Sequence, residues 1–239
     1  MIPAVELRGI RKRFGRLQVL DGIDAAIPAG KVTAVVGPNA SGKSTLIKCI
    51  LGLVRPDAGE SSVLGRRANG NPEYRRSIGY MPQGAPLPEN LTGREVLALV
   101  QSIRPGEATD EDLLHRFALG PQLDKPVRTL SGGTRQKLNA VLAFLFRPAL
   151  VVLDEPTAGL DPLASAILKD KVRDLVEQHG TTVLLTSHVM SEVEVLADDV
   201  LFLVDGRAHF HGSMEQLRVM TGEQRLERAV ARLMRMRAA

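Results

Sequence analysis

The chain has 239 residues, of which 44% are hydrophobic and 24% are charged, and its formal net charge is +4. These values are ordinary for a soluble globular protein. No apolar run approaches the roughly 20 residues that a membrane-spanning helix needs. The aromatic content of 3% argues against a protein that binds nucleic acid by stacking bases on aromatic side chains. With a single cysteine, Cys49, and no secretory pattern at the N-terminus, we expect a protein of the reducing cytoplasm.

Short apolar runs predict strands in the first eighty residues, because each is bounded by glycine, proline or aspartate. The expected strands cover residues 5–8, 18–20, 23–27, 32–36, 61–64 and 77–80. A helix is expected over residues 44–53, directly after the fourth of these strands.

The loop between strand 32–36 and helix 44–53 carries the most informative motif. Gly37-Pro-Asn-Ala-Ser-Gly-Lys-Ser44 spells G-x-x-x-x-G-K-S, and a strand, this loop and a helix together are typical of a phosphate-binding loop. Backbone N–H groups converge there on an anion, Lys43 would reach the β- and γ-phosphates, and Ser44 would bind Mg²⁺. The alternative, a glycine turn with a surface lysine, does not explain these flanks.

From about Gly84 the sequence changes to helical spacing, which predicts a helical insert in an α/β core. Helices are expected from a Thr92 cap with Glu95 in a capping box, over residues 110–118 and over residues 132–146.

The last of these helices begins with a second glycine motif, Ser131-Gly-Gly133. Ser131 is a suitable N-cap, and the exposed N–H groups and positive end of the helix dipole suit another anion. A plain helix cap is the alternative. With a phosphate loop elsewhere in the same chain, the motif suggests a site that is completed across a dimer.

After the insert, strands and helices alternate, which predicts a mostly parallel sheet. Strands are expected at residues 150–153, 181–186, 200–204 and 207–210, the last two as a hairpin, with helices over residues 165–178 and 189–197.

Polar side chains follow several of these strands, at the sheet edge where ligands bind in α/β folds. Asp154 suits a magnesium ion and Glu155 can polarise an attacking water, although a solvated strand end is the alternative for this pair. His188 could donate to a γ-phosphate oxygen or to the water. Gln83 could touch the metal and the water while sensing the orientation of the insert; a plain loop residue is its alternative.

In this order, the motifs resemble those of the ATP-binding cassette (ABC) superfamily, specifically the nucleotide-binding subunit of an export-type transporter, from about Val5 to Leu217. The resemblance implies an α/β fold of the P-loop NTPase (RecA-like) type. It would combine a mostly parallel sheet, an N-terminal antiparallel β part and a helical subdomain with the signature motif. We accordingly expect an ATP-binding core of residues 1–83 and 148–220, a helical subdomain 84–147 and a C-terminal amphipathic basic tail 221–239.

The resemblance also implies a role for each motif, with Ala158–Asp161 as the D-loop and Phe14 stacked on adenine. The expected catalytic residues are Lys43, Gln83, Glu155 and His188. The expected nucleotide-binding residues are Phe14, Gly37, Pro38, Asn39, Ala40, Ser41, Gly42, Lys43, Ser44 and Thr45, with Ser131, Gly132 and Gly133 from a second copy. The expected magnesium ligands are Ser44, Gln83 and Asp154.

Two positions depart from the family pattern. Ala40 stands where the phosphate loop commonly has glycine, which introduces strain if that position needs a positive φ. Thr134 stands in the signature where glutamine or methionine is commoner, but Ser131 and both glycines are kept. Neither change removes a catalytic group, and we expect an active ATPase.

The implied cofactors are ATP and Mg²⁺, and the implied partners are a second copy, packed head to tail around two nucleotides, and an integral membrane permease. The subunit would lie on the inner face of the cell membrane, and no nucleic acid is expected. The sequence around residues 130–146 and 158–167 resembles that of cassettes linked to nitrous oxide reductase maturation, which suggests a copper or sulfur cargo.

The main alternative is a soluble ABC ATPase that acts on nucleic acid or ribosomes. It is disfavoured because only Thr45 to Leu130 separate the phosphate loop from the signature, and because the chain holds one cassette. A P-loop kinase or GTPase leaves Ser131–Gly133 and His188 unexplained.

In the tail, apolar residues share one helical face and arginines lie mostly off it. That face consists of Leu226, Ala229, Val230 and Leu233. The tail could touch anionic lipid or a partner helix, but we expect a solvated terminal helix that frays.

Overall fold

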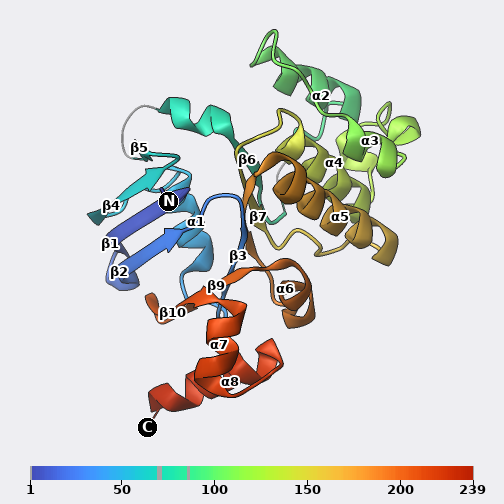
Figure 1. The fold of residues 1–239 in the computed structure, drawn as a ribbon. Coiled ribbons are helices and arrows are strands. Elements are labelled where there is room, and N and C mark those ends of the chain that lie inside the picture. The colour runs from blue at the N-terminus through green and yellow to red at the C-terminus, as the bar shows by residue number, and fades with distance from the viewer. Residues whose placement is uncertain (1, 69–71, 85–86, 239) are drawn as a thin grey trace.

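The structure is a computed structural model that describes residues 2–68, 72–84 and 87–238. A six-stranded sheet in the order β10-β9-β3-β8-β7-β6 forms its centre (Figure 1). Its members are β3 (Val32–Val36), β6 (Ile78–Met81), β7 (Leu150–Asp154), β8 (Thr182–Thr186), β9 (Asp199–Val204) and β10 (Arg207–Ser213). The first five run parallel, and β10 pairs antiparallel with β9 as the expected hairpin. The inner strands β3, β7 and β8 are buried throughout, in agreement with their mainly apolar sequences.

A second, antiparallel sheet in the order β2-β1-β4-β5 lies beside the first. Its members are β1 (Val5–Phe14), β2 (Leu17–Ile27), β4 (Ala58–Val63) and β5 (Arg66–Arg67). The expected break at Asp21-Gly22 is wrong, because β2 runs through it. Gly22 takes a φ of 74°, and register shifts between β1 and β2 absorb the irregularity.

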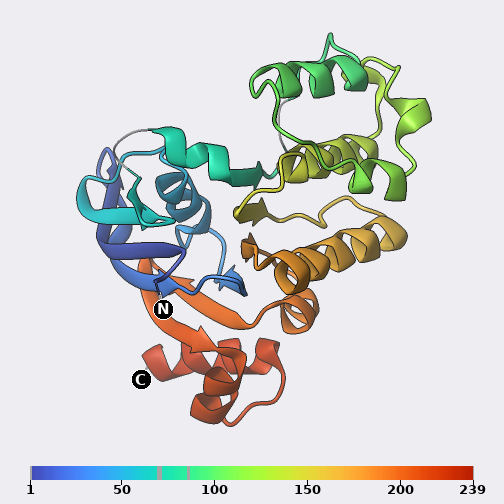
Figure 2. The same cartoon turned by 45° about the horizontal axis from the view of Figure 1, so that its top comes forward.

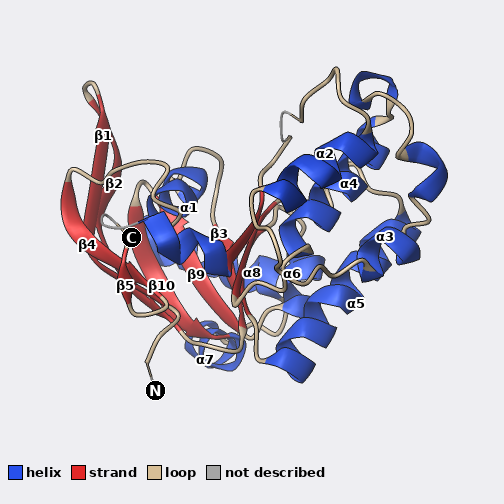
Figure 3. Ribbon diagram, turned by 90° about the horizontal axis from the view of Figure 1, so that it is seen from above, coloured by secondary structure: helices blue, strands red, loops and turns tan. Residues whose placement is uncertain are grey.

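Helices cover both faces of the central sheet (Figure 3). Helix α1 (Lys43–Ile50) packs in the core between the two sheets, whereas α4 (Gly132–Phe144), α5 (Pro162–His179) and α6 (Met190–Leu196) cover the opposite face. Alternate residues of β3 divide between these two cores: Val35 packs with α1, and Ala34 packs with the α4 and α5 side. This division follows from the two-residue period of a strand.

Helices α2 (Gly93–Ser102) and α3 (Asp112–Arg116) project beyond the sheet with α4 (Figure 2). The expected capping box of Thr92 and Glu95 is confirmed, with both reciprocal hydrogen bonds present. Short 3₁₀ turns lie at Pro72–Ser77, Gly120–Gln122 and Val127–Thr129.

Helix α3 is shorter than the expected 110–118 because Asp110 lies before the helix and binds other groups with its carboxylate. Its Oδ1 accepts the N–H of Asp112, and its Oδ2 lies 2.9 Å from Nζ of Lys171 on α5. Lys171 also lies 3.0 Å from Asp112, and its side chain is 7% exposed. A nearly buried cation therefore holds the start of α3 against α5.

The C-terminal residues form α7 (Met214–Thr221) and α8 (Leu226–Ala238). The apolar face of α8 is buried against α6 and α7, and Glu194 accepts the N–H of Leu226 at its first turn. The expectation of a solvated, fraying helix is therefore wrong: Arg228, Arg232 and Arg235 face solvent, but the apolar face belongs to the core. Among the described helices, none combines the length and the hydropathy needed to span a bilayer.

Candidate nucleotide-binding site

The strand order places the expected site residues along one sheet edge. Because β3, β8, β7 and β6 are parallel neighbours, their carboxyl ends lie side by side. The segments that follow these ends are the phosphate loop, His188, the Asp154-Glu155 pair and Gln83, in that spatial order. This is the edge at which open α/β sheets bind ligands.

Two glycines of the phosphate loop are required by close packing. A Cβ on Gly37 would lie 2.0 Å from the Leu203 carbonyl oxygen, and one on Gly42 would lie 2.8 Å from that of Val19. Gly42 is the N-cap of α1 at a φ of 104° and offers no side chain to the first turn. The N–H groups at the start of α1 consequently face the loop as donors, which suits the oxygens of a phosphate.

Lys43 lies over this loop. Its Nζ donates to the carbonyl oxygens of Gly37 and Pro38, each at 2.8 Å. Burial lowers the pKa of Lys43, and the charges of Glu155 and Asp154 partly oppose that shift. Ser41 adds a buried hydroxyl without a hydrogen-bond partner among the described residues. The loop thus presents a cation and a free hydroxyl, a donor set that fits a polyphosphate.

Ala40 in this loop has a φ of 61°, so the strain expected at this departure from the family pattern is present. We predict that Ala40→Gly raises the free energy of unfolding by about 0.5–1 kcal/mol, because glycine adopts this φ without a Cβ clash. Urea unfolding would measure the change. Ala26→Gly is the matched control, since Ala26 is exposed on β2 at an ordinary φ and the same exchange should lower stability there. Equal effects at the two positions would contradict the strain.

The two carboxylates behind the loop have different surroundings. Asp154 is 5% exposed at the end of β7, and its Oδ1 accepts a hydrogen bond of 2.7 Å from the Thr186 hydroxyl. Glu155 takes a φ of 52°, and its N–H donates to the same hydroxyl at 3.0 Å. Thr186 was not among the expected site residues. A polar residue that ends an apolar strand, next to a strand that ends in two carboxylates, is the pattern that indicates such a role.

The Glu155 carboxylate meets two of the other expected catalytic residues. Gln83 Nε2 donates to Glu155 Oε2 at 3.0 Å, and His188 Nε2 contacts Glu155 Oε1. Residues from three separate strand ends thus converge on one carboxylate. An isolated loop residue would not make such contacts. The structure therefore favours a role in the site for Gln83 and His188 over the alternative that each is an ordinary loop residue.

Phe14 ends β1 with half of its side chain exposed. The Nζ of Lys12 lies 5.4 Å from the ring centroid, and Lys12 is itself fixed by Asp57 at 2.8 Å. Because the Phe14 ring is exposed and is held in place by Lys12, it is suited to stacking on a nucleotide base. Its β1–β2 hairpin lies beside the phosphate loop, where Val19 and Leu20 limit the space at Gly42.

The second glycine motif lies elsewhere. Ser131 caps α4 by accepting the Thr134 N–H at 3.1 Å, and the Thr134 hydroxyl joins Ser131 Oγ at 2.8 Å. Figure 1 shows α4 and α1 on opposite sides of the central sheet. In the described part of the chain, no hydrogen bond or ion pair joins residues 131–133 to the phosphate loop.

The start of α4 instead packs against the segment after Glu155. Gln136 donates to the Pro156 carbonyl at 3.2 Å, and Lys137 pairs with Asp161 at 2.8 Å. Ser131 and Gly132 remain exposed. The chain therefore presents two anion-suited surfaces that it does not bring together by itself.

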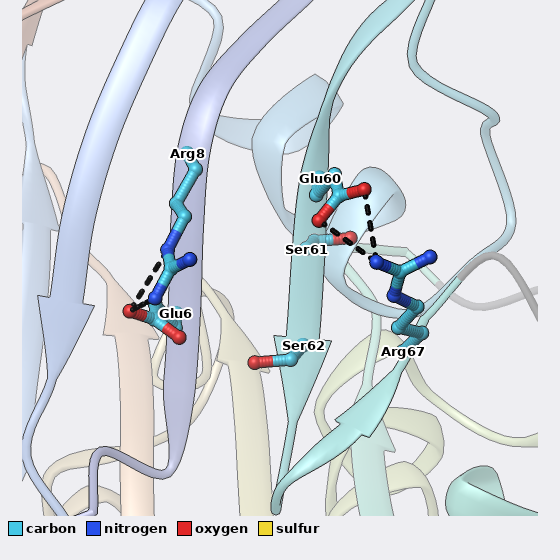
Figure 4. Close-up of a pocket in the computed structure, with 6 residues that line it drawn as sticks. All are labelled: Glu6, Arg8, Glu60, Ser61, Ser62 and Arg67. Atoms are coloured by element: carbon cyan, nitrogen blue, oxygen red, sulfur yellow. Dashed lines mark hydrogen bonds and ion pairs between the residues drawn. The ribbon is translucent and has the colours of Figure 1, made fainter.

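A further hollow lies on the antiparallel sheet (Figure 4). Its charges pair with each other: Arg8 lies 2.6 Å from Glu6, and Arg67 lies 3.1 Å from Glu60. None of its lining residues is an expected site residue, so it offers no alternative centre for the phosphate chemistry.

Comparison with known proteins identifies the family. A family model described as ABC transporter matches residues 20–158. This chain belongs to the ABC transporter family. It is 39% identical over 233 residues to the daunorubicin resistance ATP-binding protein DrrA3 of Streptomyces coeruleorubidus, which covers 94% of this chain and 72% of that protein. It is 36% identical over 220 residues to the Nod factor export ATP-binding protein I of Rhizobium sp. (strain N33), covering 90% and 72% respectively.

A solved ATP binding subunit of an ABC transporter superimposes with a TM-score of 0.90 at 32% identity, covering 97% of this chain and 99% of that one. The expected α/β fold of an ABC ATPase, with its parallel strands, antiparallel part and helices, is thereby confirmed. The chain is an ATP-binding ABC ATPase subunit.

Proposed function

We propose that two copies of this ABC ATPase pair head to tail around two ATP molecules and power an exporter. One observation carries the proposal: the phosphate loop and the Glu155 cluster share one sheet edge, while Ser131–Gly133, of which Ser131 and Gly132 are exposed, lie on the other side of the sheet. Each copy holds two separate parts of a site. Head-to-tail pairing would bring the phosphate loop of one copy to the signature of the other.

Within that pair, the loop residues Gly37–Thr45 would bind the phosphates through N–H groups, Lys43 and the Ser41 hydroxyl. Phe14 would stack on the adenine of the same nucleotide. Ser131, Gly132 and Gly133 of the second copy would close over the γ-phosphate.

Mg²⁺ fits the oxygen donors at this edge, because Ser44 and Gln83 are exposed and Asp154 is fixed by Thr186. Ser44, Asp154 and Gln83 would hold the ion, and a bound Mg²⁺ would supply neutralisation of phosphate charge.

The hydrolytic step would use the cluster around Glu155. Its carboxylate would orient and polarise the attacking water, and His188 would donate to the γ-phosphate or to the water. Gln83 contacts the same carboxylate and lies where the core meets the helical residues, so it would report their orientation. Lys43 would stabilise charge on the transferring phosphoryl group, the largest expected contribution.

The helical subdomain, residues 84–147, would transmit closure of the ATP-binding core, residues 1–83 and 148–220, to an integral membrane permease on the inner face of the cell membrane. The tail, residues 221–239, packs on that core through α8. Export is supported by a relative whose name states Nod factor export. A copper or sulfur cargo for nitrous oxide reductase maturation stays a prediction, for which the two relatives described above offer no support. An ATPase acting on nucleic acid or ribosomes is disfavoured by the same likeness.

Mixing two inactive variants tests the shared site. Lys43→Ala disables the phosphate loop and Ser131→Arg blocks the signature, so each variant alone should lose nearly all ATP hydrolysis. A mixed dimer holds one site with an intact loop and an intact signature. Steady-state phosphate release from an equimolar mixture should therefore recover to about a quarter of the wild-type rate, if pairing is random and sites act independently.

The control is a mixture of Lys43→Ala with a second phosphate-loop variant, Gly42→Val, in which no intact site can form. Recovery in both mixtures, or in neither, would overturn the shared site. Full activity of either single variant would do the same.

A further inference from the structure

Glu192, in the first turn of α6, joins three segments around the candidate site. Its Oε2 accepts a 2.6 Å hydrogen bond from the Thr157 hydroxyl, and its Oε1 lies 2.9 Å from Nζ of Lys169 on α5. The Ser165 hydroxyl, also on α5, lies 3.5 Å from Oε1. The Glu192 side chain is 16% exposed, so this carboxylate is a largely buried junction rather than part of a solvated surface.

The surroundings keep this junction charged. Burial by itself raises the pKa of Glu192, but the hydrogen bonds from Thr157 and Lys169 and the charge of Lys169 outweigh burial and lower it. Hydrogen bonds to an ionised acceptor are shorter and stronger than neutral ones. The contact to Thr157 accordingly links the segment after Glu155 to the first turn of α6.

The two linked segments directly follow Glu155 and His188, respectively. Thr157 follows Glu155 after one proline, and Glu192 lies four residues after His188. Glu155 and His188 are themselves also in contact. Glu155 sits in a tight turn at a φ of 52°, with its carbonyl accepting the Ala158 N–H at 3.2 Å. A displacement of Thr157 would therefore move Glu155 directly.

We propose that Glu192 is a positioning residue for ATP hydrolysis, which sets the separation of Glu155 and His188 by holding Thr157. This rests on the proposed role of Glu155 and His188. The pair with Lys169 anchors the junction to α5, so the loop after Glu155 keeps its place relative to the sheet. Nucleotide binding, by contrast, depends on the phosphate loop, which Glu192 does not touch.

The test compares Glu192→Gln and Thr157→Val with the wild type in steady-state hydrolysis over a range of ATP concentrations. We expect kcat to fall by about tenfold or more in each, because small misplacements of reacting groups are costly, while KM changes by less than about twofold. Thr157→Ser keeps the hydroxyl and should retain most of the wild-type kcat. The double variant should lose little more than the worse single variant, since Thr157→Val removes the same link that Glu192→Gln weakens by replacing its charged acceptor with a neutral amide.

Glu194→Gln is the matched control, because Glu194 lies on the same helix but contacts the N–H of Leu226 instead. It should leave kcat within about twofold of the wild type. Thermal unfolding of every variant shows whether the fold is kept. If Glu192→Gln unfolds, the kcat of the isosteric variant Thr157→Val still tests the positioning role.

Glu155→Gln, run in parallel, separates this inference from the proposed function. If that variant is inactive while Glu192→Gln and Thr157→Val keep the wild-type kcat, the positioning role is overturned and the proposed function stands. If kcat falls in Thr157→Ser as much as in Thr157→Val, or KM rises in step with the loss of kcat, the positioning role is also overturned. Unchanged turnover in Glu155→Gln would instead overturn the proposed function.

Discussion

Glu155→Gln is expected to lower kcat for ATP hydrolysis by on the order of 10²–10⁴-fold while ATP still binds. Glutamine keeps the size of the side chain and can still meet Gln83 and His188, but its amide cannot accept a proton from the attacking water. Phosphate release and equilibrium binding of labelled ATP measure the two effects separately. Because the nucleotide is held but not consumed, the ATP-bound dimer should persist in gel filtration.

Glu177→Gln is the control for this substitution. Glu177 is exposed on α5 and is not an expected site residue, so the same exchange there should leave turnover unchanged. Wild-type turnover in Glu155→Gln would remove Glu155 from the hydrolytic role. A loss of ATP binding together with activity would place its effect in the nucleotide pocket instead.

Lys171→Met is expected to lower the free energy of unfolding by about 3–5 kcal/mol, a large part of the about 5–15 kcal/mol that holds a typical domain. The substitution leaves the Asp110 carboxylate, whose side chain is 13% exposed, without its nearest cation. Arg147 is then its nearest positive charge, at 3.9 Å. Urea unfolding followed by circular dichroism measures the loss. Lys125→Met, on an exposed residue, should cost less than about 0.5 kcal/mol.

The same pair sets a pH dependence. Burial raises the pKa of Asp110, but the hydrogen bonds from Lys171 and from the Asp112 N–H, together with the charges of Lys171 and Arg147, outweigh burial and leave that pKa lowered. A carboxyl with a lowered folded-state pKa stabilises the fold above its unfolded pKa of about 3.9 and loses this contribution as the pH falls through the folded value. The stability difference between wild type and Lys171→Met should therefore be full at pH 7. It should shrink as falling pH protonates Asp110 in the variant, whose carboxyl no longer has Lys171 to oppose the effect of burial, and it should stop shrinking once the wild-type Asp110 is protonated as well. A difference that stays constant to pH 2 would contradict the pairing.

The sequence predicted well those structural features that depend on neighbouring residues. The glycines of the phosphate loop, the Thr92–Glu95 capping box and the buried strands each depend on residues close in sequence. Their positions in the fold agree with the expectation to within a few residues. The convergence of Gln83, Glu155 and His188 was also predictable, because a parallel sheet brings carboxyl ends to one edge.

Apart from the expected break at Asp21-Gly22, the expectations that failed concern contacts between distant segments. The apolar face of α8 was identified, but the surfaces of α6 and α7 that cover it could not be read from the tail's own sequence. Likewise, Thr186, Glu192 and Lys171 are ordinary residues of a strand or helix until the fold places their partners beside them. Nothing in the spacing of Asp110 and Lys171 indicates that they meet.

The topology of the central sheet also affects how the chain folds during synthesis. Strand β3 and its phosphate loop are made early, but both hydrogen-bonding neighbours of β3, β8 and β9, come from residues 182–204. At bacterial or eukaryotic translation speeds, roughly 10–30 s pass before those partners leave the ribosome. For that time a mainly apolar strand that is buried throughout in the folded protein has no native neighbour, so nascent chains would depend on chaperones and on protection from aggregation. Truncation before β8 should yield insoluble protein rather than a smaller ATP-binding fragment.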